Sequence, residues 1–487
     1  MPSNFLTFDF GKSSIRTIVG VYNSDNLQMY EINRIPSIPL EEDNHTYLNV
    51  GLYMQTIIEG MIKAAKEFGK VESLGIGFWG GVFALLNSDG RSFRYPLHYS
   101  DIIFKKNREL LRSKISSEEV YVGYDGGATT SSVSMLLAIK EELSKEFSEA
   151  SSILMMPDYL AYLLTGTISS EETIISSGGL SNVYKQWNKK LFDYLNIPIN
   201  LFSTIVKPGT IYPLLPIFTS LDTNLADTQY VRIASHDTAS AVSTLNMQKN
   251  TAFISSGSTS IIGVITDEPI LSKKAYKDGL LNEIAADGKI RLCRNINGMT
   301  IQNNCIIYWN RDGITFSFDE IEKEIFNVPQ LKYMINPNSN ACTSSDDTPL
   351  AIMEYFKTND REIPTSPPEI LSAINTGLAM EYRRTIESLE AATGNHIDTI
   401  YIVGGGLQNK VLCQYAANAT GCKVVTGNKE ATSIGNILMQ AKALKLFTDY
   451  SDISRITSNS YPESNTYYPK NTQEWERCYT DYLRMES

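Results

Sequence analysis

The sequence predicts an α/β protein built from two sheet-containing domains, and three observations support that expectation. Short runs rich in β-branched and aromatic residues alternate with longer amphipathic stretches, which is typical of sheets covered by helices. A strand–turn–strand pattern opens the chain, and a second one follows almost halfway along it. At roughly 100–200 residues per domain, a chain of 487 residues is long enough for two or more domains with cores of their own.

The first strand–turn–strand unit consists of residues 4–10 and 15–21 with a Gly/Ser turn at 11–14, a pattern that predicts a β-hairpin. Asp9 lies at the end of its first strand, beside backbone N–H groups that the strand pairing does not use. A carboxylate there could hold a hydrated Mg²⁺, and the turn could hold phosphate oxygens. The alternative is an ordinary Asx-type turn with a solvated Asp9.

The second unit has strands at 251–256 and 260–265 around a turn of Gly257, Ser258 and Thr259. Two such Gly/Ser-rich units suggest an internal duplication, in which two related domains face one ligand. We therefore expect a first domain at 1–247, a second at 248–454, and a polar, Tyr-rich tail at 455–487 on the surface.

Periodicity predicts further elements between these units and after them. Helices are expected at 51–69, 133–148, 369–392 and 433–446, and strands at 73–77 and 398–403. The order of these elements agrees with an α/β architecture.

The charge balance excludes some kinds of partner. The chain has 43 Lys and Arg residues against 54 Asp and Glu residues, a formal net charge of −11. Without a dense basic run, such a chain is repelled by nucleic-acid phosphates. The longest uncharged apolar stretch, 74–86, is too short for a membrane span, and the first residues carry no export signal. We expect a cytoplasmic protein that binds neither nucleic acid nor membrane, with monomer and homodimer both open.

Residues 404–406 form a triple-glycine turn after an apolar strand and before an amphipathic helix. Asn409 stands where a GxGxxG fingerprint requires its third glycine, which disfavours a Rossmann fold. Three glycines still allow a flat ligand such as adenosine to approach the backbone, near the free N–H groups of the next helix. A plain strand-to-helix turn is the alternative.

Asp237, in the segment ASHDTASAV, is the candidate general base. A carboxylate within hydrogen-bond reach of a hydroxyl can accept its proton when that hydroxyl attacks a phosphoryl group. The alternative is that Asp237 or Ser235 caps the helix that begins near Thr238. Trp79 and Gly80 could present an aromatic face and bare backbone to a sugar, or Trp79 could simply fill a core.

Taken in chain order, these segments resemble one family. They are DFGKSSIR at 9–16, GIGFWGGVFALL at 75–86, MPDYLAYLLTG at 156–166, ASHDTASAV at 234–242, SSGSTSIIG at 255–263, NINGMTIQN at 295–303, and YIVGGGLQNKVLCQYAANATG with EATSIGN at 401–436. Together they resemble the FGGY carbohydrate kinases and, within that family, the rhamnulokinase branch. The resemblance covers the chain from about residue 4 to about residue 450.

This resemblance implies two actin-like (ribonuclease H-like) domains of the sugar kinase/Hsp70/actin superfamily around a central cleft. It implies transfer of the γ-phosphoryl group of ATP, with Mg²⁺, to a hydroxyl of a ketose-type sugar. Asp237 then becomes the catalytic base and Asp9 the metal-associated carboxylate. The implied sugar contacts are Trp79, Gly80, His236 and Thr238. The implied ATP contacts are Gly11, Lys12, Ser13, Ser14, Arg16, Gly257, Ser258, Asn295, Asn303, Gly404, Gly405, Gly406 and Gln408.

The chain departs from the rhamnulokinase pattern near the expected sugar site. Where those kinases read IDTWGVD, residues 76–82 place Gly77 and Val82 at the two acidic positions, and Ser100 replaces an arginine. Since a site built to bind particular hydroxyls discriminates strongly, we expect these changes to alter which sugar fits. The alternatives are a kinase of another sugar, such as L-fuculose or xylulose, and an inactive nucleotide-binding sensor or scaffold.

Overall fold

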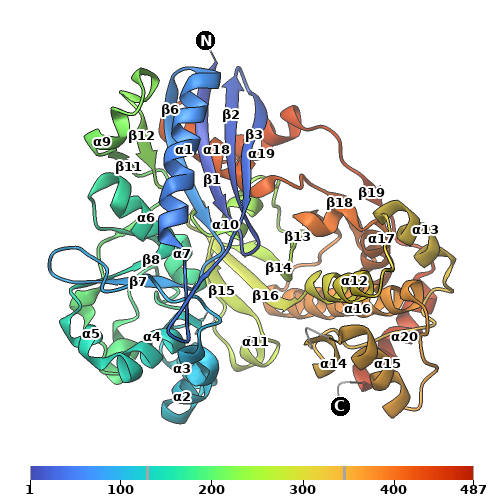
Figure 1. Ribbon diagram of the computed structural model, residues 1–487. Helices are drawn as coiled ribbons and strands as arrows, with labels where there is room; N and C mark the ends of the chain where they lie inside the picture. Colours follow the sequence, from blue (N-terminus) through green and yellow to red (C-terminus); the bar gives the residue numbers. More distant parts are fainter. Residues whose placement is uncertain (1, 128–130, 344–346, 486–487) are drawn as a thin grey trace.

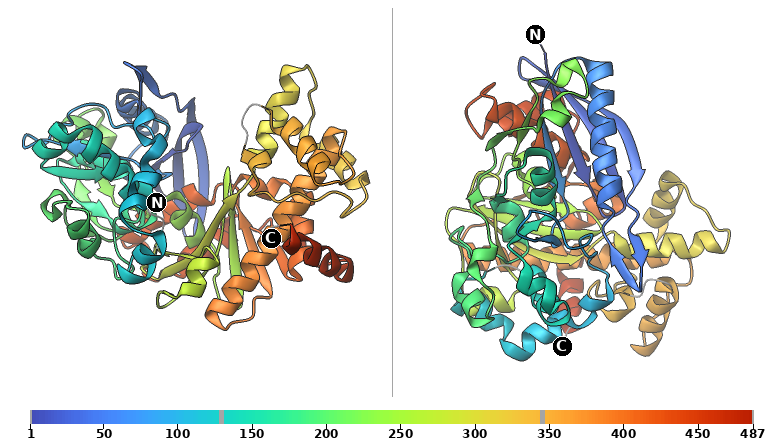
Figure 2. Two further views of the ribbon diagram at one scale, coloured as in Figure 1. Left: turned by 90° about the horizontal axis from the view of Figure 1, so that it is seen from below. Right: turned by 60° about the vertical axis from the view of Figure 1, so that its left-hand side comes forward.

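The computed structural model describes residues 2–127, 131–343 and 347–485. The chain forms two lobes, each built on a twisted sheet, and the sheets lie side by side near the middle of the molecule (Figures 1 and 2). This arrangement confirms the predicted α/β class with two sheet-containing units.

The sheet of the N-terminal lobe has six strands in the order β11-β12-β6-β1-β2-β3. β1, β2 and β3 form an antiparallel meander, β6 and β12 continue it in parallel with β1, and β11 closes the edge. The strands are β1 (Ser3–Phe10), β2 (Ser14–Asn23), β3 (Asn26–Pro36), β6 (Val71–Phe78), β11 (Ile211–Pro213) and β12 (Gln229–Val231).

The sheet of the C-terminal lobe has seven strands in the order β15-β16-β14-β13-β17-β18-β19. β13, β14 and β16 form an antiparallel meander, and β17 and β18 continue it in parallel with β13. The strands are β13 (Thr251–Ser256), β14 (Thr259–Thr266), β15 (Leu281–Ile284), β16 (Ile290–Asn297), β17 (Thr399–Val403), β18 (Lys423–Thr426) and β19 (Thr466–Tyr467).

One topology therefore occurs twice. In each lobe a hairpin opens the sheet, a third antiparallel strand follows, and two parallel strands join the first strand on its other side. The two hairpins, β1–β2 and β13–β14, are the two strand–turn–strand units predicted from the sequence. The predicted internal duplication is thus visible in strand order and direction.

Short ribbons and helices complete both lobes. The smaller strands are β4 (Leu40–Glu42), β5 (His45–Tyr47), β7 (Phe83–Leu86), β8 (Ser152–Met155), β9 (Ser170–Glu171) and β10 (Ile205–Val206). The helices up to residue 243 are α1 (Val50–Phe68), η1 (Ile102–Lys106), α2 (Asn107–Lys114), α3 (Ser117–Gly123), α4 (Ser131–Glu142), α5 (Ser144–Glu149), α6 (Met156–Thr165), α7 (Glu172–Ser177), α8 (Lys189–Tyr194), η2 (Ile199–Leu201), α9 (Pro216–Thr219), η3 (Thr223–Leu225) and α10 (Asp237–Ser243). Those that follow are α11 (Lys273–Lys277), α12 (Thr300–Arg311), α13 (Phe318–Asn327), α14 (Asn340–Thr343), α15 (Thr348–Thr358), α16 (Pro367–Thr393), η4 (Gly405–Gln408), α17 (Lys410–Thr420), α18 (Ala431–Ala443), α19 (Asp452–Ser460) and α20 (Thr472–Arg484).

Local sequence signals explain where the long helices begin and end. The side chain of Asn49 accepts a hydrogen bond from Leu52 N and starts α1, which ends at Gly69 with φ of 78°. A capping box of Ser366 and Glu369 starts α16, and Gly394 ends it in the left-handed conformation. Both helices bury their apolar faces against a sheet.

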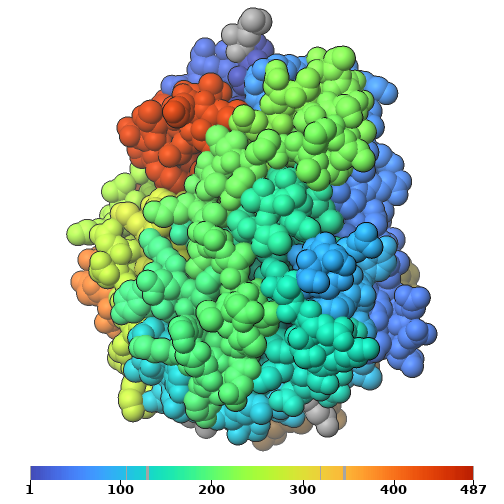
Figure 3. Space-filling view, turned by 90° about the vertical axis from the view of Figure 1, so that its left-hand side faces the viewer, coloured from blue at the N-terminus to red at the C-terminus, as the bar shows by residue number. Residues whose placement is uncertain are grey.

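Helix α18 covers one face of the N-terminal sheet although it belongs to the last quarter of the chain. A Cβ on Gly20 of β2 would lie 2.6 Å from the Ile437 side chain, so glycine permits this close approach. Gln440 donates to the carbonyl of Leu6 at 3.0 Å and accepts from Ser73 at 2.8 Å. The neighbouring α19 packs beside β3, and this late segment lies next to the amino-terminal strands on the surface (Figure 3).

The structure differs from the sequence-based expectations at two elements. The helix expected at 133–148 is divided into α4 and α5 because the backbone of Leu143 leaves the helical region, with ψ of 45°. The tail expected on the surface instead contributes α20, whose Trp475, Tyr479 and Tyr482 are buried in the C-terminal core. This apolar stripe on one side of α20 explains why the helix packs rather than projects.

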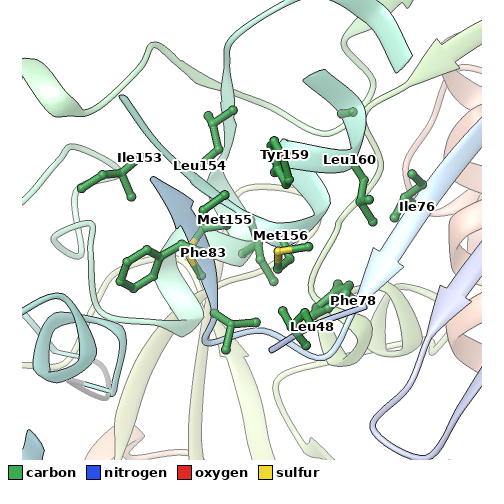
Figure 4. Packing of buried hydrophobic residues seen from close by; sticks show 14 of the residues in the cluster. Leu48, Ile76, Phe78, Phe83, Ile153, Leu154, Met155, Met156, Tyr159 and Leu160 are labelled. Atoms are coloured by element: carbon green, nitrogen blue, oxygen red, sulfur yellow. The ribbon is translucent and has the colours of Figure 1, made fainter. Parts of the chain in front are cut away.

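An apolar cluster at the carboxyl end of β6 supports the cleft described below. Phe78 and Ile76 of β6 lie close to Met156 and Leu160 of α6, with Phe83 of β7 alongside (Figure 4). These side chains are almost completely buried. Because each such side chain contributes roughly 1.5–3 kcal/mol on burial, they fix the strand end from which Trp79 and Gly80 follow.

Candidate active site

A cleft of about 850 Å³ lies where the two lobes face one another. Its lining includes eleven of the residues singled out in the sequence. They are Gly11, Lys12, Ser13, Trp79, Gly80, His236, Asp237, Thr238, Gly257, Ser258 and Asn295. Residues separated by more than two hundred positions are thus brought to one cavity.

The sheet topology explains this convergence. β1, β6 and β12 run in parallel, so their carboxyl ends meet at one edge of the sheet. Asp9 stands at the end of β1 and Trp79 directly follows β6. The chain after β12 continues alongside β6, where Phe78 N donates to Ser235 O at 2.8 Å, and then begins α10 at Asp237. The duplicated topology brings the β13–β14 turn to the opposite wall.

Asp237 is the first residue of α10, and 37% of its side-chain surface is exposed, facing the cleft. Its Oδ1 accepts hydrogen bonds from Thr238 N at 2.5 Å and from the Thr238 hydroxyl at 3.1 Å. Enclosure by the cleft walls and the nearby charge of Asp9 raise the pKa of Asp237 to about 6. His236 occupies the capping position of α10 without a side-chain cap bond, so neither Asp237 nor Ser235 acts as the cap.

A buried polar network underlies the segment that carries Asp237. Glu171 accepts hydrogen bonds from Ser235 N at 3.1 Å and from the Thr173 hydroxyl at 2.7 Å, and that hydroxyl accepts from His236 N at 3.2 Å. Burial raises the pKa of Glu171 to about 8. The backbone amide of Glu171 in turn donates to Asp158, which pairs with Arg232. This network fixes the backbone from which His236 and Asp237 project.

The aromatic wall of the cleft is built around Trp79. Its ring lies 5.2 Å from that of Tyr99, and the Lys12 ammonium lies 5.6 Å and 5.4 Å from these two ring centres. Gly80 has φ of 90°, and a Cβ there would lie 3.2 Å from the Ser177 hydroxyl. The arrangement presents an aromatic face, a cation and bare backbone to the cavity.

The hairpin turns of both lobes open into the cleft. In the first, Gly11 N donates to Ser14 O at 2.9 Å, and Lys12 and Ser13 are exposed. In the second, Gly257 N donates to Thr259 O at 3.2 Å, and Ser258 is exposed. Backbone turns of this kind bind anionic oxygens through successive N–H groups.

Eight of the singled-out residues do not line this cavity. They are Asp9, Ser14, Arg16, Asn303, Gly404, Gly405, Gly406 and Gln408. Arg16 forms ion pairs with both Asp9 and Glu430. Asp9, the implied metal-associated carboxylate, and Arg16, an implied ATP contact, are therefore partners of one another. Asn303 is exposed on α12 and Gln408 is exposed on η4.

The triple-glycine turn packs against the end of β13. A Cβ on Gly404 would lie 2.8 Å from Ser256 O, and one on Gly406 would lie 1.9 Å from the Ser256 hydroxyl oxygen. Asn409 caps α17 by accepting from Leu412 N, and its amide donates to Gln302 and Asn375. The residue that breaks the dinucleotide fingerprint is therefore a helix cap.

We expect Gly406→Ala to displace this turn because its new Cβ overlaps Ser256, lowering the free energy of unfolding by about 1–3 kcal/mol and weakening ATP binding. Gly405→Ala is the matched control, since no atom lies within 4 Å of its added Cβ. Thermal unfolding and calorimetric titration with ATP measure both effects. Equal behaviour of the two variants would contradict the close packing of the turn.

Asp237 in the cleft and Asp9 beside it fit a hydrated magnesium ion. Across the described ranges, no group of three or more His, Cys, Asp or Glu side chains could hold a metal alone. Mg²⁺ usually keeps several waters and binds through one or two carboxylates together with substrate phosphates. Asp9 and Asp237 are close enough for the charge of Asp9 to raise the pKa of Asp237, and a cation relieves that repulsion.

Four functional candidates were not found from the sequence: Glu171, Thr173, Glu283 and Arg291. The first two belong to the network beneath His236. Glu283 and Arg291 come from the C-terminal sheet: Glu283 lines the cleft, and the fully buried Arg291 contacts both His236 and Glu283. Only their tertiary contacts reveal them, because no spacing or motif marks them in the sequence.

Two ribonuclease H-like lobes on either side of a cleft define the sugar kinase/Hsp70/actin class of proteins. Within that class, the N-terminal domain pattern of the FGGY family of carbohydrate kinases matches residues 5–243, and the C-terminal domain pattern matches residues 252–444. The chain belongs to this family, as the sequence motifs indicated. It is a sugar kinase, and its cofactors are ATP and Mg²⁺.

Curated relatives match over nearly the whole chain. A protein named rhamnulokinase from Bacteroides thetaiotaomicron is 33% identical over 486 residues, covering 99% of both sequences. Another rhamnulokinase, from Oceanobacillus iheyensis, is 30% identical over 469 residues, covering 94% of this chain and 96% of its own.

Solved structures share the fold at much lower identity. A ligand-bound xylulose kinase from Lactobacillus acidophilus superimposes with a TM-score of 0.80 at 16% identity, covering 99% of this chain and 97% of its own. A Plasmodium falciparum glycerol kinase with ADP superimposes with a TM-score of 0.77 at 14% identity, covering 99% and 97%. In the part of the chain that the structure describes, no helix has the length and apolar character needed to cross a membrane.

Proposed function

We propose that this kinase phosphorylates a ketose of the rhamnulose type and that Asp237 is its general base. The observation that carries this proposal is the position of Asp237, which faces the same cavity as the two hairpin turns. A hydroxyl held beside its carboxylate can lose a proton while its oxygen attacks a phosphoryl group near those turns.

The reaction transfers the γ-phosphoryl group of ATP to a hydroxyl of the sugar. The sugar oxygen forms a bond to the γ-phosphorus, the bond between that phosphorus and the β,γ-bridging oxygen breaks, and ADP leaves. The sugar proton passes to Asp237, and the turns at Gly11 and Gly257 stabilise charge on phosphoryl oxygens through backbone N–H groups. When bound, ATP would supply the phosphoryl group, and Mg²⁺ would neutralise part of the negative charge on the phosphate oxygens.

The choice of sugar rests on the relatives and on where the sequence departures lie. Proteins named rhamnulokinase match across both lobes. Neither of the two lost acidic positions lines the cleft. Val82 is buried, and a Cβ on Gly77 would face Asn436 and Ile233. These two departures therefore leave the residues that line the cleft unchanged, and L-rhamnulose becomes the first substrate to test.

Coupled ADP release with Mg-ATP against L-rhamnulose, L-fuculose, xylulose, aldoses and polyols tests this proposal. We expect L-rhamnulose to give the highest kcat/KM, with other ketoses at least about tenfold lower, because unpaired hydroxyl partners discriminate strongly. A preference for an aldose or a polyol would overturn the ketose assignment. ATP binding without turnover of any sugar would contradict Asp237 as a working base.

A further inference from the structure

A buried arginine of the C-terminal lobe contacts the histidine next to the proposed base. Arg291 lies on β16 opposite Glu283 of β15, and its Nη2 is 2.7 Å from Glu283 Oε2. The same Nη2 lies 2.9 Å from Nδ1 of His236. Both the Arg291 and the Glu283 side chains are almost completely shielded from solvent.

This contact determines which nitrogen of His236 carries the proton. A guanidinium has hydrogen-bond donors and no acceptor, so the Nδ1 atom that faces it must accept. In a neutral imidazole the proton then resides on Nε2. That Nε2 lies 3.6 Å from Oδ1 of Asp237.

The surroundings also keep the ring neutral. Burial and the positive charge of Arg291 lower the pKa of His236 well below its ordinary value. Glu283 Oε2 is 3.9 Å from Nδ1, but the guanidinium lies closer to that carboxylate than the imidazole does. The acidic group nearest to Nδ1 is thus already paired.

We propose that Arg291 and Glu283 are positioning residues of this kinase, which hold His236 as the Nε2–H tautomer so that its ring donates toward Asp237 and the sugar side of the cleft. Without them, the ring could present an unprotonated Nε2 to the carboxylate, with no donor for a sugar oxygen. The kinetic consequence rests on the proposed function, whereas the tautomer itself does not.

The position of this contact links the two lobes. The hairpin that carries Glu283 and Arg291 belongs to the C-terminal sheet, yet its first strand is bound to the N-terminal lobe. Ile284 N donates to the Ser176 hydroxyl at 2.9 Å, and Asn282 N donates to Gly127 O at 2.6 Å. The C-terminal lobe therefore sets the hydrogen-bonding state of His236, a residue of the N-terminal lobe.

Nitrogen-15 NMR of the full chain labelled at histidine tests the tautomer directly, because the chain contains only four histidines. The His236 signal is assigned by its loss in His236→Asn. We expect the native protein at pH 7 to show a neutral ring with a protonated Nε2 and an unprotonated Nδ1. A protonated Nδ1, in either the neutral or the charged ring, would overturn the proposal.

Variants then connect the tautomer with turnover. In Arg291→Met/Glu283→Gln, which leaves no unpaired charge, we expect mixed tautomers at His236. We also expect kcat to fall about 10–100-fold, the range seen when the outer partner of a metal-bound histidine is removed, with the KM for ATP unchanged. Arg291→Lys keeps a donor and should restore part of the Nε2–H population.

Arg294→Met is the matched control, because it removes another cation from β16 that pairs with Glu381 rather than with His236. It should leave the His236 signal unchanged, and thermal unfolding separates loss of fold from loss of positioning. An unchanged His236 signal and unchanged kcat in the folded double variant would overturn the proposal. If the native tautomer is as expected while every sugar fails as a substrate, the proposed function fails and the tautomer assignment stands.

Discussion

Replacing Asp237 with asparagine should lower sugar-dependent ADP release about 10²–10⁴-fold, because a positioned general base contributes about that much and asparagine cannot accept the proton. The amide keeps the shape of the side chain and can still accept from Thr238 N, which donates to Oδ1 in the native protein. The kinetic constants are measured with the sugar that the panel selects.

Calorimetric titration provides the control for Asp237→Asn. ATP should bind with little change, because both hairpin turns remain intact and one negative charge has left the cleft. Retention of native turnover would contradict the role of Asp237. Loss of ATP binding together with turnover would point instead to a structural defect.

The pH profile of the native enzyme follows from the same carboxylate. Since the pKa of Asp237 is raised to about 6 and the base must be deprotonated, kcat/KM should fall about tenfold per pH unit below about pH 6. The residual activity of Asp237→Asn should lack this acidic limb. A native profile that stays flat to pH 5 would refute the assignment.

Replacing Asp158 with alanine should lower the free energy of unfolding by about 3–5 kcal/mol, since it leaves the charge of Arg232 buried and unpaired. The two side chains are 2.8 Å apart and 0% exposed. Because domains are stable by only about 5–15 kcal/mol, this is a large fraction of the total. Equilibrium denaturation in urea measures the change.

Two further variants make this test specific. Asp193→Ala breaks an exposed pair with Lys189, whose side chains are 57% and 63% exposed, and should cost less than about 0.5 kcal/mol. Asp158→Leu/Arg232→Met removes both buried charges and should recover much of the stability lost in Asp158→Ala. If Asp158→Ala lowered the free energy of unfolding no more than Asp193→Ala does, the buried pair would not stabilise the fold as expected.

Local patterns allowed the duplicated hairpins and the principal helices to be predicted. β-branched runs around Gly/Ser turns identify both hairpins, and strand direction then places their turns at one cleft. The burial of α20 could also have been predicted, because Trp475, Tyr479 and Tyr482 recur at helical spacing. The polar composition of the tail concealed that stripe.

The network around His236 could not be predicted in this way. No local pattern marks Glu171 or Arg291. Glu171 becomes a partner of the His236 loop only once the N-terminal lobe has folded, and Arg291 only once the two sheets have met. The pairing of Asp9 with Arg16 is similarly a product of strand register, since the two residues face each other across β1 and β2. Register depends on the whole sheet rather than on a motif.

The placement of α18 has a consequence for how the protein is made. At about 5–20 residues per second, Ala431 leaves the ribosome on the order of ten to forty seconds after Ser243. Throughout that interval the face of β1, β2 and β6 that later receives Ile437 and Gln440 lacks the cover that α18 provides. The first lobe to be synthesised is therefore completed by one of the last helices to emerge, and a nascent chain must keep that face from other contacts until then.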